Sequence, residues 1–310
     1  MRRSSAVLVQ LAAFAMALCS AKTQEPFAIP QEDAQARAAY DAMIQALRAA
    51  PTLRYESEYR WSGKDGELGH CRYVAELAKP NWFRLTATSV EGGRGGTLVG
   101  DGRTLWTFWH GARPFFSTED PKTYRDARDH QYMKKPAPPG GHSIGHETTM
   151  LGAGMSMTIL DPSTFHGYTD SLQRYLDGVQ SKGTLTPGEG EERCDVLLVS
   201  FMKGQRTWEL CVSQRDHLPR KLREVIRVQH EIVVEETWSK VEVGVDLPAE
   251  RFRWEPPSGW TQWTPPRPED RLLKAGAEAP DFELLLADGR KQALSALRGQ
   301  AVWLVFWRVG

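Results

Sequence analysis

A succession of short segments, in which polar and apolar residues alternate between turn signals, constrains the fold more than any other feature of this chain. Alternation over about four to eight residues places every second side chain on one face of a β-strand. Gly63 to Gly66 and Asp101-Gly102 are typical of the tight turns between such strands. In the first half of the chain the segments are Arg54–Trp61, Cys71–Leu77, Trp82–Ala87, Thr97–Val99 and Thr104–Trp109. Strands at this spacing predict an antiparallel meander.

The same pattern returns later in the chain. Four further strands are expected at Cys194–Phe201, Thr207–Gln214, Arg220–Val228 and Ile232–Val241. A helix is expected before the first strand, at Gln31–Ala50, and Pro51 ends it. Its apolar residues recur at helical spacing, at Tyr40, Met43, Ile44 and Leu47. The chain is therefore predicted to be mainly β with helices, and the helix is expected to pack against the sheet.

The residues between the two β halves, about 113–180, have a different character. Tyr124–Tyr132 and Ser171–Leu176 suggest short helices, and a Pro- and Gly-rich loop runs from Pro136 to Gly141. The stretch Met150–Leu160 is apolar and contains Gly and Met. We expect a helical and irregular insertion that lies across one end or face of the sheet.

Several local motifs add a resemblance to this layout. They are Lys79-Pro80-Asn81-Trp82-Phe83-Arg84-Leu85, Asp101-Gly102-Arg103-Thr104-Leu105-Trp106, Leu218-Pro219-Arg220-Lys221-Leu222, and Asp246-Leu247-Pro248 through Phe252 to Pro256-Pro257. The chain from Gln31 to Trp260 resembles the LolA-like proteins, which include outer-membrane lipoprotein-sorting and DUF2092-type members. The resemblance implies that residues 27–255 form a curved antiparallel half-barrel with a lid of helices. In the family, the hollow under that lid holds acyl chains.

A Pro-rich linker is expected at residues 256–275, and residues 276–310 carry a second set of motifs. These are Ala279-Pro280-Asp281-Phe282, Asp288-Gly289, Leu294-Ser295-Ala296-Leu297-Arg298-Gly299 and Phe306-Trp307. They resemble the opening of a TlpA-like thioredoxin-fold domain of the redoxin, AhpC/TSA group. In that group a Cys-x-x-Cys motif follows the strand, but Gly310 is reached without one. We expect an incomplete α/β thioredoxin-like segment here, cut off before its catalytic dithiol.

Three hypotheses of function follow from these resemblances. The first is an exported thiol–disulfide oxidoreductase acting on protein thiol or disulfide substrates, with no catalytic residue in this chain. The second is a periplasmic carrier or binding module for lipid or lipoprotein acyl chains. In a third hypothesis, the β domain only positions a redox domain at a site in the cell envelope.

The N-terminus predicts export. Arg2 and Arg3 precede the apolar run Ala6–Leu18, and Cys19-Ser20-Ala21 fits a cleavage site, which gives a signal peptide at residues 1–21. Lipoprotein anchoring at Cys19 is the alternative, although Leu18 fits it poorly. We expect a periplasmic or otherwise exported protein with cell-envelope partners. Lys+Arg and Asp+Glu balance at 39 each, so no nucleic-acid partner is expected.

Candidate site residues come from the aromatic strands of the first half. Phe83 and Leu85 share one face of their strand by alternation, and Trp106 and Phe108 share one face of theirs. We expect these four to line the hollow that takes an apolar ligand. The alternative is that they fill an ordinary core, and the sequence does not reveal which face is concave.

The cysteines and histidines suggest structural roles. Cys194 and Cys211 flank an expected hairpin, and a disulfide between them would staple it; two buried free thiols are the alternative. A two- or four-residue loop would put both cysteines on one face, and a three-residue loop on opposite faces. His142 and His146 are four apart, but no third ligand is indicated, so neither a metal nor a cofactor is expected.

Overall fold

The computed structural model describes residues 29–116, 129–137, 144–168, 172–186, 192–228, 230–266, 273–286 and 288–302. The chain forms two compact units. One is Pro26–Pro268, and the other comprises Met1–Glu25 and Glu269–Gly310. The expected signal peptide, with Cys19, lies outside the described residues, as does most of the apolar run that ends at Trp307.

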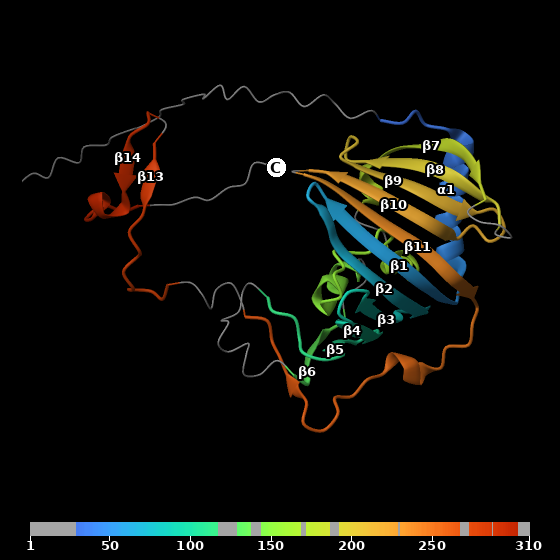
Figure 1. Ribbon diagram of the computed structural model, residues 1–310, viewed down its shortest axis with the longest axis horizontal. Coiled ribbons are helices and arrows are strands. Elements are labelled where there is room, and N and C mark those ends of the chain that lie inside the picture. Colours follow the sequence, from blue (N-terminus) through green and yellow to red (C-terminus); the bar gives the residue numbers. More distant parts are fainter. Residues whose placement is uncertain are drawn as a thin grey trace, which may run out of the picture. The chain divides into compact units, whose positions relative to one another are not determined.

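The first unit begins with helix α1, Ala34–Ala49, close to the expected position. The carboxylate of Asp33 caps it by accepting hydrogen bonds from the backbone N–H groups of Gln35 and Ala36. The helix buries one apolar stripe, formed by Ala36, Tyr40, Met43, Ile44 and Leu47. This stripe packs into the core on one face of the sheet, called here the inner face (Figure 1).

One open sheet of twelve strands forms the body of this unit. Its order is β12-β6-β5-β4-β3-β2-β1-β11-β10-β9-β8-β7, and all neighbours are antiparallel except β12 and β6. Figure 1 shows the sheet curving as it passes from β6 to β7, which matches the expected antiparallel half-barrel. The strands are β1 Thr52–Gly63, β2 Gly66–Ala78, β3 Trp82–Ser89, β4 Gly95–Asp101, β5 Thr104–Trp109, β6 Gln131–Pro136, β7 Leu176–Leu185, β8 Cys194–Phe201, β9 Arg206–Ser213, β10 Pro219–Arg227, β11 Glu231–Val243 and β12 Thr261–Gln262.

The expected helical insertion contains no α-helix in its described part. Residues 144–168, called the lid here, contain only two short 3-10 helices, η1 at Gly145–Leu151 and η2 at Pro162–Thr164. Gly152 and Gly154 have positive φ angles, a conformation that ends or interrupts a helix. Further along, the short helix expected at Ser171–Leu176 is present as a single 3-10 turn, η3 at Gln173–Tyr175, which leads directly into edge strand β7. Most of the helix suggested at Tyr124–Tyr132 lies outside the described residues, and its last two residues begin β6.

The beginning of the expected Pro-rich linker packs on the sheet instead of leaving it. Residues 249–263, called the strap here, contain the 3-10 helix η4 at Ala249–Phe252 and strand β12. Arg251 forms an ion pair with the buried carboxylate of Glu76, at 2.5 Å. Phe252 is almost fully buried, because it lies over the outer face of β3 and β4. The strap therefore gives β4 a cover on its outer face, and β4 is buried along nearly all its length.

In the second unit the described residues form a two-stranded hairpin, β13 at Glu283–Leu285 and β14 at Lys291–Ala293. The 3-10 helix η6, Leu294–Leu297, follows, and Gly299 has a φ of 85°. The expected short strand, turn and helical turn are therefore present. Leu284 and Leu285 are exposed within the described residues.

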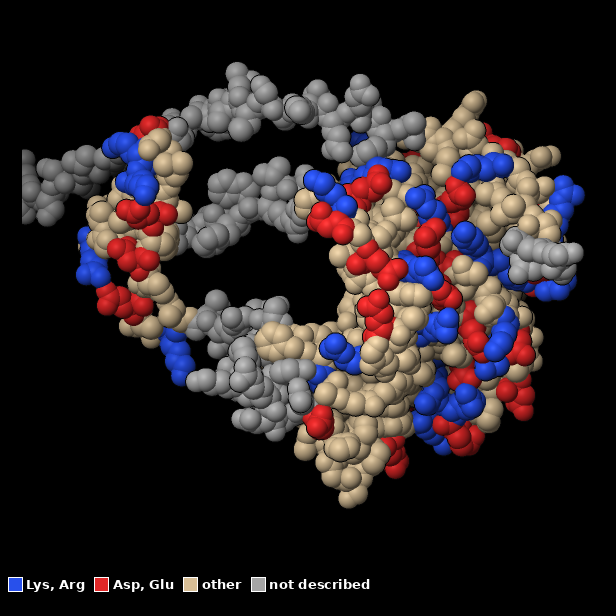
Figure 2. Space-filling view, viewed as in Figure 1, with Lys and Arg blue, Asp and Glu red and all other residues tan. Residues whose placement is uncertain are grey.

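Charged residues of both signs alternate over the outer face of the first unit. Figure 2 shows Lys and Arg interspersed with Asp and Glu across β9, β10, β11 and β1. Cross-strand ion pairs account for much of this pattern, for example Arg54–Glu242, Lys240–Glu56 and Lys182–Glu209. Exposed pairs of this kind each contribute little stability. None of the helices in the described ranges combines the length and apolar character needed to cross a membrane.

Candidate functional site

The inner face of the sheet is an apolar surface to which almost every strand contributes. Antiparallel register aligns its side chains in rows, one of which runs from Leu77 through Phe83 and Gly100 to Leu105. A second row runs from Leu222 through Glu236 and Tyr59 to Cys71. With α1 and the lid, these strands form one continuous core. The inner face is therefore the largest apolar surface on which a ligand could be held.

The lid covers this face and depends on the sheet for its polar contacts. The indole Nε1 of Trp61 donates to the carbonyl of Gly154 at 2.6 Å, and Nε1 of Trp109 donates to the carbonyl of Met150 at 2.8 Å. The hydroxyl oxygen of Tyr59 accepts from the backbone N–H of Ser156 at 3.1 Å and lies 2.7 Å from its Oγ. The lid has few backbone hydrogen bonds of its own, so these contacts satisfy groups that a regular helix would satisfy internally.

The lid approaches strand β2 closely at Gly69. A Cβ atom added there would collide with the carbonyl oxygen of Gly154 and with the indole nitrogen of Trp61. Glycine is therefore required at this position for the lid to lie flat on β2. The apolar side chains that the lid inserts into the core are Ile144, Leu151, Ala153, Met155, Ile159, Leu160 and Phe165.

The space under the lid is nearly filled. The void between α1, β1, β2, β11 and the lid has a volume of about 10 Å³ and is bounded by residues such as Leu47, Tyr55, Leu160 and Trp238. This is room for one water molecule at most. An apolar ligand can occupy the inner face only after the lid has moved and its apolar side chains have left the core.

A buried carboxylate, Glu236 on β11, lies in the middle of this apolar face. It has no exposed surface, and it accepts hydrogen bonds from the Tyr73 hydroxyl at 3.0 Å and from Nε1 of Trp238 at 3.2 Å. A third bond, at 2.8 Å, comes from the backbone N–H of Ile159 in the lid. Burial raises the pKa of Glu236 to about 7, against the opposing effect of these three donors.

A second buried carboxylate, Glu224 on β10, is paired with a cation. Its Oε1 accepts from Nε of Arg206 and from Nε1 of Trp208, both at 2.8 Å. Nη2 of Arg206 also lies 2.7 Å from the same oxygen. The inner face therefore has two carboxylates among apolar and aromatic side chains. In the hydrogen bonds described here, the carboxylate that binds the lid is that of Glu236.

The register divides the four sequence-predicted ligand residues between the two faces of the sheet. Phe83 and Leu85 point inward and are buried in the core. Trp106 lies opposite Val99, and Phe108 lies opposite Thr97, on the outer face. The expectation that these four line one hollow is therefore wrong. Glu236, Tyr59 and Tyr73 were not predicted, although a glutamate between Val234 and Trp238 in an alternating strand is a signal that the sequence contains.

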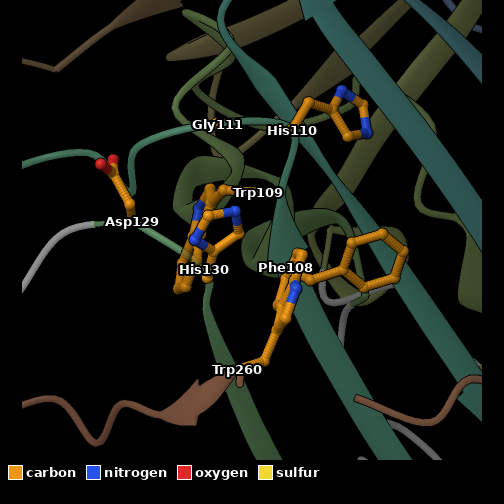
Figure 3. A pocket seen from close by; sticks show the side chains of 7 residues that line it. All are labelled: Phe108, Trp109, His110, Gly111, Asp129, His130 and Trp260. Carbon is orange, nitrogen blue, oxygen red and sulfur yellow. The ribbon is translucent and has the colours of Figure 1, made fainter. Parts of the chain in front are cut away.

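Trp106 and Phe108 instead join an aromatic cluster that the strap completes. Phe108 stacks on Trp254 with ring centroids 4.4 Å apart, and Trp106 packs edge-on against the same indole at 5.5 Å. A shallow pocket of about 290 Å³ opens beside this cluster, where the indole of Trp260 lies between His130 and Phe108 (Figure 3). His110, which also lines it, contacts the Thr97 hydroxyl at 2.9 Å, and burial lowers the pKa of its imidazole.

Among the described residues, Cys71, Cys194 and Cys211 are free thiols, so the expected Cys194–Cys211 bond is not formed. The loop between β8 and β9 has four residues, 202–205, and both cysteines lie on one face. However, Cys194 is opposite Ser213 and Cys211 is opposite Val196, which makes the cysteines diagonal neighbours. Diagonal Cα atoms are about 7–8 Å apart, beyond the usual reach of a disulfide. Burial raises the pKa of Cys71 to about 12 and of Cys194 to about 11.

The histidine pair offers no metal site within the described residues. His146 is exposed in η1, and His142 lies outside the described residues. No group of three or more His, Cys, Asp or Glu in the described ranges could hold a metal ion.

Comparisons with known proteins find similar solved structures and nothing else. No family model and no curated protein matches this chain. A LolA superfamily protein from Nitrosomonas europaea has 12% identity and a TM-score of 0.33, covering 71% of this chain and 97% of its own. A chain of the Pseudomonas aeruginosa MucA/MucB complex has 11% identity and a TM-score of 0.34, covering 84% of this chain and 75% of its own. A putative outer-membrane lipoprotein-sorting protein domain from Vibrio parahaemolyticus has 7% identity and a TM-score of 0.31, covering 70% and 96%. At these values the likeness carries no argument about function.

Proposed function

We propose that the Pro26–Pro268 unit is an exported binding module that holds an apolar chain, such as a lipid acyl chain, on the inner face of the sheet beneath the lid. The observation that carries this proposal is the construction of the lid. The lid, which has no α-helix in its described residues, covers the apolar inner face. It is attached there by hydrogen bonds to Trp61, Tyr59 and Glu236, which a ligand could replace.

The contrast between the lid and α1 supports this assignment. The backbone groups of α1 form hydrogen bonds within the helix and with its cap, Asp33. The helix therefore does not depend on the sheet for these bonds, whereas the lid does. The lid inserts seven apolar side chains, and an acyl chain that replaced them would restore the same kind of contact. The apolar contacts that are lost when the lid lifts would thus be replaced by contacts with the bound chain.

The oxidoreductase hypothesis has no support among the described residues. Thiol–disulfide exchange requires an accessible thiolate with a lowered pKa. Cys71, Cys194 and Cys211 are buried, and burial raises the pKa of each thiol. The binding hypothesis therefore takes precedence, and export remains part of the proposal because of the N-terminal sequence.

Titration with a fluorescent fatty acyl probe tests this function, together with native mass spectrometry of protein purified without detergent. We expect saturable binding that is weakened by Leu77→Trp, because a larger side chain on the inner face would occupy the space of the ligand. Val228→Trp is the matched control, because Val228 is exposed. Equal effects of the two substitutions, or no saturable binding by the unmodified protein, would contradict the proposal.

A further inference from the structure

The hydrogen bond between the lid and Glu236 indicates what kind of ligand the inner face selects. Two of the three donors to this carboxylate, Tyr73 and Trp238, belong to the sheet and stay in place when the lid moves. The third is the backbone N–H of Ile159, which leaves with the lid. An acceptor on Glu236 is then exposed to the space that the ligand enters.

This acceptor lies deep in apolar surroundings. Its row on the inner face consists of Leu222 on one side and Tyr59 and Cys71 on the other. A buried carboxylate that loses a donor without replacement incurs a large desolvation penalty. A ligand group that donates a hydrogen bond at this position would remove that penalty, whereas a group that only accepts would not.

The charges around the site disfavour an anionic ligand. Glu224 lies close enough to raise the pKa of Glu236, and Asp161 of the lid is also buried. Arg206 is already bound to Glu224. His166 of the lid is held neutral, because burial lowers its pKa to about 4. A carboxylate placed beside Glu236 would therefore meet like charges. Lys79, which lies 4.2 Å from the ring centroid of Phe165 in the lid, is a separate cation outside these ion pairs.

We propose that the ligand of the inner face is an apolar chain whose polar end carries an N–H donor, either an amide or an amine, and that Glu236 accepts the hydrogen bond that Ile159 gives up. This inference rests on the proposed function, since it concerns the same site. It adds that a free fatty acid is a poor ligand and that an N-acyl or alkylamine compound is a good one.

Four probes with the same twelve-carbon chain test the inference by competition with the fluorescent acyl probe. They are dodecanamide, dodecylamine, methyl dodecanoate and dodecanoate, measured at about pH 8, where Glu236 is largely ionised. We expect the amide or the amine to bind about tenfold or more tightly than the ester, since hydrogen bonds to charged groups are the stronger class. Dodecanoate should bind most weakly. The order of amide and amine identifies the head group.

The variant Glu236→Gln supplies the internal control. Its side chain both donates and accepts, so the advantage of the amide over the ester should shrink, and dodecanoate should bind more tightly than it does to the unmodified protein. Glu235→Gln is the matched substitution, because the neighbouring residue points to the outer face and pairs with Arg223. It should leave the order of the four probes unchanged. Circular dichroism and the melting temperature establish that both variants fold.

The possible outcomes separate this inference from the proposed function. Equal affinities of amide, amine and ester, or tightest binding of dodecanoate, would overturn the donor requirement and leave the binding function intact. An unchanged probe order in Glu236→Gln would do the same. If the fluorescent acyl probe itself does not bind saturably, the proposed function fails, and the inference fails with it.

Discussion

The backbone N–H of Ile159 lies 2.8 Å from the carboxylate of Glu236, which joins the lid to strand β11 inside the core. The lid is thus held by a group whose charge depends on pH. Because the carboxylate is fully buried, its protonation state affects both the stability of the fold and the attachment of the lid.

The first prediction concerns this pH dependence. Burial raises the pKa of Glu236 from an ordinary 4.5 to about 7 in the folded protein. Between these values the folded state binds more protons at this site than the unfolded state. The free energy of unfolding contributed by Glu236 should therefore fall as pH rises through this window, by an amount on the order of a few kcal/mol, and level off above it.

Denaturant unfolding of the unmodified protein and of Glu236→Gln, at a series of pH values, measures this contribution. His166 acts in the opposite direction, because its lowered pKa makes stability rise as pH increases from about 4. Because both proteins contain His166, its effect cancels in the difference between their free energies of unfolding. A difference that does not change between about pH 5 and about pH 8 would show that Glu236 is ionised throughout.

The second prediction concerns the close approach at Gly69. Gly69→Ala should force the lid away from β2, because the new Cβ cannot share space with the carbonyl of Gly154. We expect a lower melting temperature and faster hydrogen exchange at the backbone N–H groups of Ser156 and Ile159. Gly63→Ala is the control, since its Cβ would meet only the flexible end of Leu68 at 3.2 Å. Unchanged exchange in Gly69→Ala would mean that the lid tolerates the added methyl group.

Most of the sheet could be predicted from the sequence, because alternation is a local property. Nine of the expected strands lie within a few residues of their positions in the structure, and α1 was found by its apolar stripe. Strands β6, β7 and the two-residue β12 were missed. The first is short and contains Lys134, Lys135 and Pro136, and the second contains Gly178 and Gly183 and is exposed along most of its length. Their pairing partners stabilise them, and a single sequence does not identify those partners.

The candidate site was harder to predict, because it depends on register between strands. Alternation shows that Phe83 and Leu85 share a face, but only the pairing of Phe83 with Gly100 and of Gly100 with Leu105 puts Trp106 on the other side. A one-residue difference in a turn reverses this assignment. The sequence predicts an insertion lying across the sheet, but not the conformation of the lid, because that conformation depends on contacts with residues far away in sequence, such as Tyr59 and Glu236.

The third prediction concerns thiol reactivity. Cys71, Cys194 and Cys211 should react slowly with Ellman's reagent in the native protein at about neutral pH, because burial raises their pKa values and keeps the thiolate scarce. All three should react at once after unfolding without reductant. A rapidly reacting native thiol would reopen the redox hypothesis. Loss of two thiols in the unfolded protein would reveal a disulfide that the diagonal register of Cys194 and Cys211 disfavours.

The last prediction separates the strap from the C-terminal unit by truncation. A chain ending at Pro268 keeps the whole first unit and should retain its melting temperature. A chain ending at Pro248 loses the Arg251–Glu76 ion pair and uncovers the outer face of β4. It also loses the aromatic side chains of the strap, which are Phe252, Trp254, Trp260 and Trp263.

Removing a buried Phe side chain alone costs about 3–5 kcal/mol, so the shorter chain should melt many degrees lower or fail to fold. The substitution Phe252→Ala in the intact chain tests the same packing without truncation, and Phe115→Ala, at an exposed position, is the control for loss of an aromatic ring. Equal melting temperatures for chains ending at Pro268 and Pro248 would show that the strap does not stabilise the sheet. A large loss on truncation at Pro268 would show instead that Glu269–Gly310 stabilises the first unit.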